Sequence, residues 1–139
     1  MPVDLAHNEL LQGFQPGWVG WFRDYCIPLN FDTGACVIEG GSAAAGMYLL
    51  LDGTVSVLNR AGELINRIEA GGIVGEMALI DGGARSADVV ADTPLASLLI
   101  TRDRLEAIGH ERPDIGLILM TNLCRIITKR ARHLHQLID

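Results

Sequence analysis

The residues best able to do chemistry are concentrated in one stretch of the chain, residues 72–87. Gly75 removes a side chain where a ligand could approach closely, and residues 76–80 are long enough for about one and a half helical turns. A helix start presents free N–H groups, here those of Met77 and Ala78, which can bind an anion. This pattern indicates an anion-binding segment and not an ordinary loop.

Arg85 supplies the cation that such a segment needs. It is the only basic residue between Arg67 and Arg102. A single guanidinium that faces a helix N-terminus makes a pocket for one phosphate, because its planar fork donates two parallel hydrogen bonds. The hydroxyl of Ser86 could add another donor.

Glu76 adds a second kind of chemistry to the same segment. A carboxylate beside a phosphate is unfavourable unless it accepts hydrogen bonds from another part of the ligand, and a sugar hydroxyl would serve. Taken singly, Glu76 could instead complement a helix dipole, and Arg85 could pair with Asp81 or Asp88 at the surface. Together they favour a site for a phosphate and a sugar.

Short apolar runs bounded by turn residues precede and follow this segment and predict strands of a barrel or sandwich. Asp52-Gly53 lies between two runs and has the residue types of a tight hairpin turn, because both residues tolerate positive φ. The predicted strands are Cys36 to Ile38, Met47 to Leu51, Thr54 to Leu58, Glu63 to Ile68, Ala87 to Ala91 and Leu95 to Ile100.

Helices are expected at both ends. Apolar residues three and four apart over residues 3–25 suggest short helices broken at Pro16-Gly17, and a short helix is expected over residues 102–108. Pro113 then opens a long helix that could run to Leu137. Its near-heptad apolar positions need a partner, either the barrel or a second copy. These positions are Met120, Leu123, Ile127, Leu134 and Leu137.

The run Gly75-Glu76-Met77-Ala78-Leu79, followed by Arg85-Ser86-Ala87, resembles the phosphate-binding cassette of cyclic nucleotide-binding domains. The stretches from Ile38 to Gly40 and from Met47 to Val55 resemble the early strands of that family. A 3′,5′-cyclic nucleotide carries one ring phosphate and one free ribose hydroxyl, so its polar groups match the site.

The resemblance implies a fold and a domain plan. The expected fold is α+β and mainly β: an eight-stranded β-roll, or jelly-roll barrel, with N-terminal helices, a cassette helix and a long C-terminal helix. One domain would fill residues 1–139, with a helical preface over 1–26, the roll over 27–101 including the cassette at 72–87, and C-terminal helices over 102–139.

The resemblance also assigns roles. Glu76 would accept the ribose 2′-OH, Arg85 would bind the cyclic phosphate, the N–H groups near Met77 and Ala78 would bind phosphate oxygens, and Ser86 would contact phosphate or base. Gly75 and Ala87 complete the ligand-binding set. The family often closes its pocket with a residue of the last helix. Arg130, the polar interruption in the apolar face of that helix, is our candidate for this base lid, ahead of Thr128, Lys129 and Arg132.

Composition and charge narrow the function classes. The chain has 139 residues, of which 49% are hydrophobic and 20% charged, so it can bury a core. The first 100 residues contain 12 acids and 4 bases. This acidic body would be repelled by a phosphate backbone, so we expect no nucleic-acid binding through this chain.

The cysteines, the histidines and the lengths of the apolar stretches argue against a cofactor site and a membrane anchor. The three cysteines are too scattered for a zinc site or a disulfide framework; they are Cys26, Cys36 and Cys124. Unpaired cysteines of this kind are typical of proteins in the reducing cytoplasm. The four histidines fall outside the predicted strands, so the ligands of a metal-binding roll enzyme are missing. No stretch reaches the ~18 apolar residues of a membrane span.

These observations predict a sensor without catalytic activity, metal or cofactor. We expect it to bind cyclic AMP or cyclic GMP, with cyclic AMP favoured, and to signal through movement of the C-terminal helix. A homodimer through that helix is possible on this pattern. The sequence ends just after the helix, so we expect the effector elsewhere: either the chain is the sensor half of a catabolite-activator-type transcription regulator, or it is the regulatory tail of an enzyme or transporter.

Overall fold

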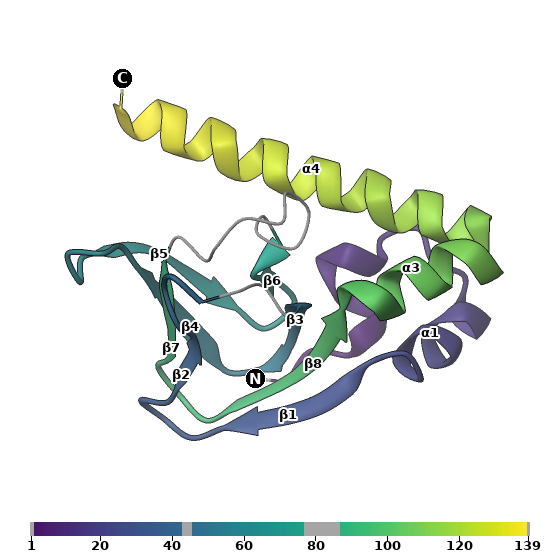
Figure 1. Cartoon of the computed structure of the whole chain (residues 1–139), viewed down its shortest axis with the longest axis horizontal. Helices are drawn as coiled ribbons and strands as arrows, with labels where there is room; N and C mark the ends of the chain where they lie inside the picture. The colour runs from purple at the N-terminus through teal and green to yellow at the C-terminus, as the bar shows by residue number, and fades with distance from the viewer. Residues whose placement is uncertain (1, 43–45, 77–86, 139) are drawn as a thin grey trace.

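Two four-stranded antiparallel sheets form the body of the protein in the computed structural model, which describes residues 2–42, 46–76 and 87–138. The first sheet has the order β1 (Ile27–Phe31), β8 (Leu95–Thr101), β3 (Gly46–Asp52), β6 (Ile73–Val74). The second has the order β2 (Cys36–Ile38), β7 (Asp88–Ala91), β4 (Thr54–Leu58), β5 (Leu64–Glu69). Figure 1 shows the helices gathered on the side of the first sheet.

Strand periodicity divides the interior into two hydrophobic clusters. Leu49 of β3 belongs to the cluster beneath the helices, and its neighbour Leu50 belongs to the cluster between the sheets. Ile73 and Val74 of β6 divide in the same way. Successive strand residues point to opposite faces, so β3 and β6 of the first sheet carry buried apolar residues on both faces.

The N-terminal segment packs against the first sheet as η1 (Leu5–His7), η2 (Glu9–Leu11) and α1 (Pro16–Arg23). Asn8 caps η2, because its side-chain oxygen accepts from Leu10 N at 3.0 Å. Its amide Nδ2 donates to Gly72 O at 3.1 Å, which ties the segment to the residue before β6. The N-terminal segment is therefore fixed beside the start of the cassette.

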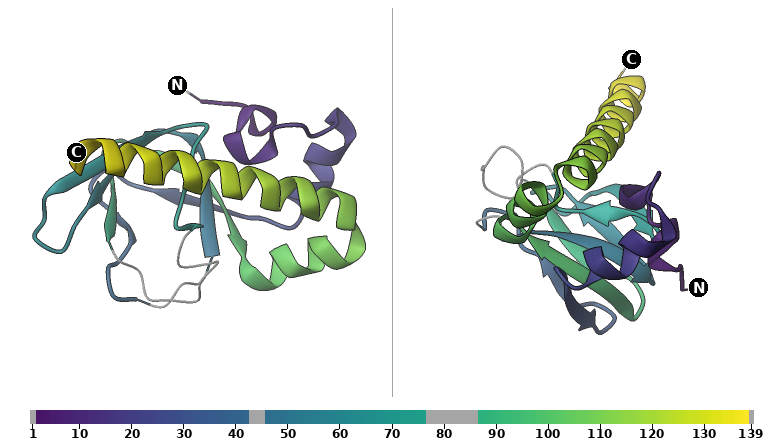
Figure 2. Two further views of the ribbon diagram at one scale, coloured as in Figure 1. Left: turned by 90° about the horizontal axis from the view of Figure 1, so that it is seen from above. Right: turned by 90° about the vertical axis from the view of Figure 1, so that its right-hand side faces the viewer.

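Two helices follow the sheets, α3 (Arg102–Glu111) and α4 (Pro113–Ile138). Asp114 lies in the first turn of α4, and its bond to Arg112 at 2.8 Å lowers the pKa of its carboxyl. The first half of α4 packs on the body through fully or nearly fully buried side chains, namely Ile115, Leu119, Leu123 and Ile126. The C-terminal end of α4 projects away from the sheets (Figure 2).

The structure confirms the predicted fold class: a mainly β roll of two sheets, eight strands within the described residues, and helices at both ends. It also confirms the long helix from Pro113. Two short strands were missed, β1 and β6. The expected cassette helix lies outside the described residues.

One local prediction was wrong. Asp52-Gly53 is not a hairpin turn, because β3 and β4 lie in different sheets; the chain crosses between the sheets at Gly53, whose φ of +96° does have the expected sign. The predicted apolar stripe on α4 is divided in its burial. Leu123 is buried against the body, whereas Met120 is 41% exposed.

Candidate functional site

Glu76 occupies a buried position at the end of β6. The two residues of β6 are buried and pair with β3, Ile73 opposite Leu49 and Val74 opposite Tyr48. Gly75 then adopts φ +85°, a left-handed conformation that a side chain rarely permits. The chain turns there, and Glu76 follows with only 5% of its surface exposed.

A buried carboxylate requires a partner, and α4 supplies it. Arg130 Nη1 donates to Glu76 Oε1. The second terminal nitrogen, Nη2, donates to the carbonyl oxygen of Ile73 at 2.6 Å. One guanidinium thus binds both the carboxylate and the backbone of the strand that precedes it, and this charge-assisted pairing offsets the cost of burying Glu76.

A third charged residue completes the group. Glu9 of η2 accepts from Arg130 Nη2 at 3.3 Å and from Ile73 N at 3.2 Å, both through Oε1. The backbone N–H of Glu9 also donates to Gly71 O at 2.8 Å. We call Glu9, Glu76 and Arg130 the charge cluster. It joins the N-terminal segment, β6 and α4 at one point.

The far end of the cassette segment is fixed by the second sheet. Ala87 is half-buried and leads into β7, whose first residue, Asp88, accepts from Gly40 N at 2.5 Å. A side chain at position 40 would bring its Cβ within 3.1 Å of that carboxylate. The close approach of Gly40 anchors the chain where it leaves the segment 77–86.

The structure brings together only some of the predicted site residues. Gly75, Glu76 and Ala87 lie at the two ends of the cassette, and Arg130 reaches Glu76. Met77, Ala78, Arg85 and Ser86 lie outside the described residues. Contact of Arg130 with a base stays a prediction. In the structure Arg130 contacts Glu76, Glu9 and the carbonyl oxygen of Ile73.

Glu9 is the site residue that sequence reasoning missed. It lies 121 positions from Arg130, and no local spacing links the two. Its only sequence signal is its place next to Asn8, a residue type suited to cap a helix. In the parts of the chain that the structure describes, no group of three or more His, Cys, Asp or Glu side chains could hold a metal ion. None of the helices described there is long and apolar enough to cross a membrane.

The fold is a two-sheet roll in which Arg130 of the last helix contacts the backbone of β6. Residues 28–112 match the family model described as "Cyclic nucleotide-binding domain". The chain therefore belongs to the cyclic nucleotide-binding domain family.

Individual relatives agree with this assignment. The crystal structure of a cyclic nucleotide-binding domain from Methylobacillus flagellatus superposes with a TM-score of 0.85 at 28% identity, covering 90% of this chain and 72% of that one. "Glutaminase 2" of Bradyrhizobium diazoefficiens is 36% identical over 128 residues, 92% of this chain. The "CRP-like cAMP-activated global transcriptional regulator" of Mycobacterium tuberculosis is 25% identical over 138 residues, 96% of this chain.

The chain matches different shares of the length of these two curated relatives. The chain spans 20% of the length of the glutaminase and 62% of the length of the regulator. In both, the matching segment is a part of a longer protein.

Proposed function

We propose that this chain is a regulatory sensor that binds one 3′,5′-cyclic nucleotide, cyclic AMP in preference to cyclic GMP. Glu76 accepts the ribose 2′-OH, Arg85 and the N–H groups of Met77 and Ala78 hold the phosphate, and Ser86 contacts phosphate or base. Gly75 and Ala87 shape the ends of the pocket. The name of the mycobacterial regulator supports the preference for cyclic AMP.

The contact between Arg130 and Glu76 carries the functional proposal. It joins the carboxylate assigned to the ribose directly to α4. A change at the ligand site therefore changes the free energy with which α4 is held, and a ligand shifts a conformational equilibrium by its difference in affinity for the two states. We propose that α4 transmits occupancy in this way, with Arg130 as the lid residue.

The proposal assigns no catalysis, metal or cofactor to this chain. Its output goes to an effector, and the two curated relatives represent two kinds: an enzyme and a transcription regulator. A regulatory unit of an enzyme is our first choice because the glutaminase is the more similar of the two. The reading frames on both sides of this segment distinguish these options. The free cysteines favour a reducing compartment, and we place the domain in the cytoplasm.

A homodimer through α4 is also proposed. Leu117 is 69% exposed and Met120 41%, and Cys124 is exposed on the same helix. These residues, with Ile127 and Ala131, follow the three- and four-residue spacing of a heptad seam. The described α4 side chains that pack on the body lie on another face, so this seam is available to a second copy.

Titration calorimetry tests the proposed ligand. We expect saturable binding of cyclic AMP, weaker binding of cyclic GMP, and no binding of 5′-AMP at the same concentrations. Arg85→Ala should lose ~2 to 4 kcal/mol of binding free energy, as expected when a phosphate charge loses its partner. Arg60→Ala removes an exposed arginine between β4 and β5 and is the matched control. An unchanged affinity in Arg85→Ala would sink the assigned phosphate site.

A further inference from the structure

The charge cluster lies where α4 leaves the body. Asn122 is the preceding polar attachment of the helix, and its Nδ2 donates to Leu10 O at 2.7 Å and to Gln12 O at 2.9 Å. Arg130 lies two turns further on. Residues 131–133, the next described side chains, are all exposed. Arg130 is thus the last contact of α4 with the body among the described side chains of this helix.

The charges of the cluster decide whether a nucleotide can displace Arg130. Glu76 is buried, and Glu9 adds a second carboxylate beside the same guanidinium. A ribose hydroxyl is neutral and the cyclic phosphate is an anion, so neither can replace the cation. Removing Arg130 would leave a buried carboxylate without its counter-charge, which is far more costly than sharing it.

A carboxylate has enough acceptor capacity for both partners. Its two oxygens offer about four lone-pair positions, so Oε1 can stay on Arg130 while Oε2 accepts the ribose hydroxyl. Glu9 fixes the other side of the guanidinium and is itself held by the N–H of Ile73 at 3.2 Å. Both backbone groups of Ile73 therefore take part in setting the position of Arg130.

We infer that Arg130 and Glu9 are positioning residues for ribose recognition: Glu9 holds Arg130, and Arg130 orients the Glu76 carboxylate so that its second oxygen meets the 2′-OH. The inference rests on the proposed function and adds regulation to it. Under this inference, Glu76 binds the ribose 2′-OH well only while α4 is docked on the body. Any partner that pulls α4 away then lowers the affinity for nucleotides that carry a 2′-OH.

The test compares cyclic AMP with 2′-deoxy cyclic AMP, which lacks only the group that Glu76 would bind. Calorimetry on the wild-type chain should show about tenfold or greater preference for cyclic AMP, because a lost hydrogen bond to a charged group has this magnitude. In Arg130→Gln the preference should fall to roughly threefold or less, with the loss carried by cyclic AMP. Glu9→Gln should give an intermediate preference, since the amide keeps an acceptor but loses the charge.

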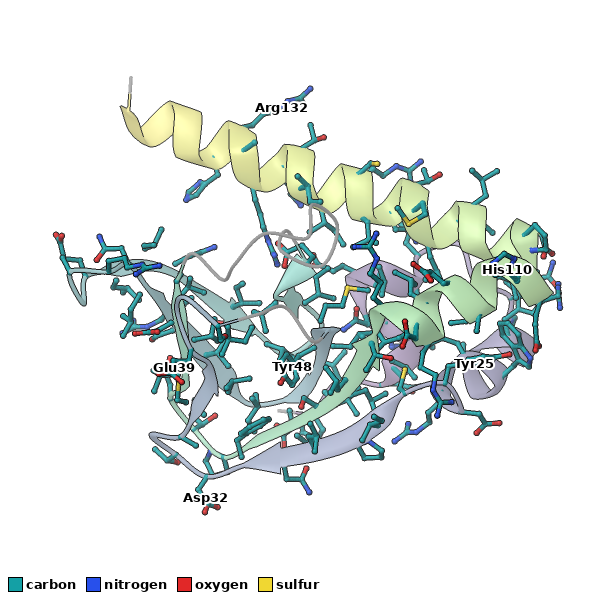
Figure 3. The ribbon with its side chains drawn as sticks, in the orientation of Figure 1. Tyr25, Asp32, Glu39, Tyr48, His110 and Arg132 are labelled. Carbon is teal, nitrogen blue, oxygen red and sulfur yellow. The ribbon has the colours of Figure 1, made fainter. Side chains whose placement is uncertain are left out.

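Controls separate this role from a general loss of structure. Arg132→Gln removes a guanidinium that points away from the sheets (Figure 3), and Glu69→Gln removes an exposed acid on β5. Both should keep the wild-type preference. A merely structural role of Arg130 would weaken both nucleotides equally and leave their ratio unchanged. Glu9 is 38% exposed at its side chain, so Glu9→Gln remains informative even where Arg130→Gln folds poorly.

The possible failures can be told apart. A wild-type chain that binds neither nucleotide contradicts the proposed function itself. Wild-type binding without preference between the two analogues contradicts the ribose role of Glu76. Wild-type preference that survives in both Arg130→Gln and Glu9→Gln overturns the positioning role alone, and tighter binding of cyclic AMP by Arg130→Gln would show that Arg130 competes with the ligand.

Discussion

At Gly75 a single backbone conformation brings the proposed ribose carboxylate into a buried place. The residue has φ +85°, and the carboxylate of Glu76 meets Arg130 directly after it. An L-residue at this φ is strained by roughly 1 to 2 kcal/mol. Glycine avoids this strain, and the turn that it permits sets the geometry of the contact between Glu76 and Arg130, which are 54 residues apart along the chain.

Gly75→Ala should therefore lower the free energy of unfolding by roughly 1 to 2 kcal/mol and weaken cyclic AMP binding as well. Urea denaturation and calorimetry measure the two effects. Gly20→Ala, at an exposed position inside α1 where an added Cβ meets nothing within 4 Å, is the control. It should keep or raise stability, because alanine favours a helix over glycine by roughly 1 kcal/mol. Equal effects of the two changes would contradict a special role for the turn.

Cysteine chemistry at the residue scale depends on burial. Burial raises the pKa of the Cys26 thiol to about 12, and its Sγ lies 3.6 Å from Phe22 O, to which it donates. At pH 8 only about one Cys26 in ten thousand would be a thiolate, the form that reacts with alkylating agents. We expect iodoacetamide to label Cys26 far more slowly in the folded chain than in the chain unfolded in urea, with the rate in the folded chain rising about tenfold per pH unit. Peptide mass spectrometry measures both rates, and similar rates at pH 8 would contradict the prediction.

At the scale of elements, α4 is held by two different kinds of contact. Its first half is held by apolar packing and by the two hydrogen bonds of Asn122, which is 3% exposed. Beyond Ile126, the described contacts of α4 with the body are those of Arg130 in the charge cluster. The proposed function therefore expects the first half to stay docked while the region around Arg130 responds to the ligand.

Asn122→Ala should destabilise the fold by about 1 to 3 kcal/mol, because it removes the donor from the carbonyl group of Leu10 in a buried place and from that of Gln12 in a partly buried one. Thermal and urea denaturation measure the loss. Thr121→Ala is the matched control, since the Thr121 hydroxyl is exposed and bonds only within its own helix, to Leu117 O, among the contacts described. That change should stay within about 0.5 kcal/mol of wild type. A similar loss from both variants would show that Asn122 does not anchor α4.

Local sequence patterns predicted the positions of strands and helices far better than they predicted which of these elements contact each other. Short apolar runs bounded by turn residues identified most strands, and Pro113 marked the start of α4. The two-residue strand β6 is too short to show a period. The choice between hairpin and sheet crossing at Gly53 depends on the pairing of β3 with β8, a contact distant in sequence. Leu123 and Met120 differ in burial because of the position of the N-terminal segment, which helix periodicity alone does not encode.

The candidate site shows the same division between local and distant information. Gly75 and Glu76 could be predicted as site residues because they are adjacent in the cassette-like run that begins at Gly75. Arg130 stood out only as a polar break in an apolar face, and its contact with Glu76 spans 54 residues. Glu9 was marked only by its place next to Asn8, a signal that points to a helix start and not to Arg130. Charged partners from three elements meet only after the sheets and helices have packed.

For the whole molecule, the arrangement places Arg130 and the exposed apolar residues of α4 on the same helix. The packed face of α4 contacts the body through Leu119 and Leu123, whereas Leu117, Met120 and Cys124 are exposed. Exposed leucine and methionine at heptad spacing are stabilised by packing against an equivalent helix. Assembly through this seam would carry a change at the Arg130 contact from one copy to its partner.

Leu117→Glu should therefore weaken self-association while leaving the fold of each copy unchanged, because the side chain is 69% exposed and the new charge would face its own copy across a two-fold seam. Sedimentation should show wild-type particles of twice the 15.0 kDa chain mass and a dissociation constant at least about tenfold higher in the variant. Leu64→Glu is the control, since Leu64 is 50% exposed but lies on β5. Mild oxidation adds an independent readout: a parallel seam brings Cys124 of two copies together and should cross-link them through this residue and not through Cys36. A wild-type chain that stays monomeric with and without cyclic AMP, or equal effects of the two glutamates, would contradict the seam.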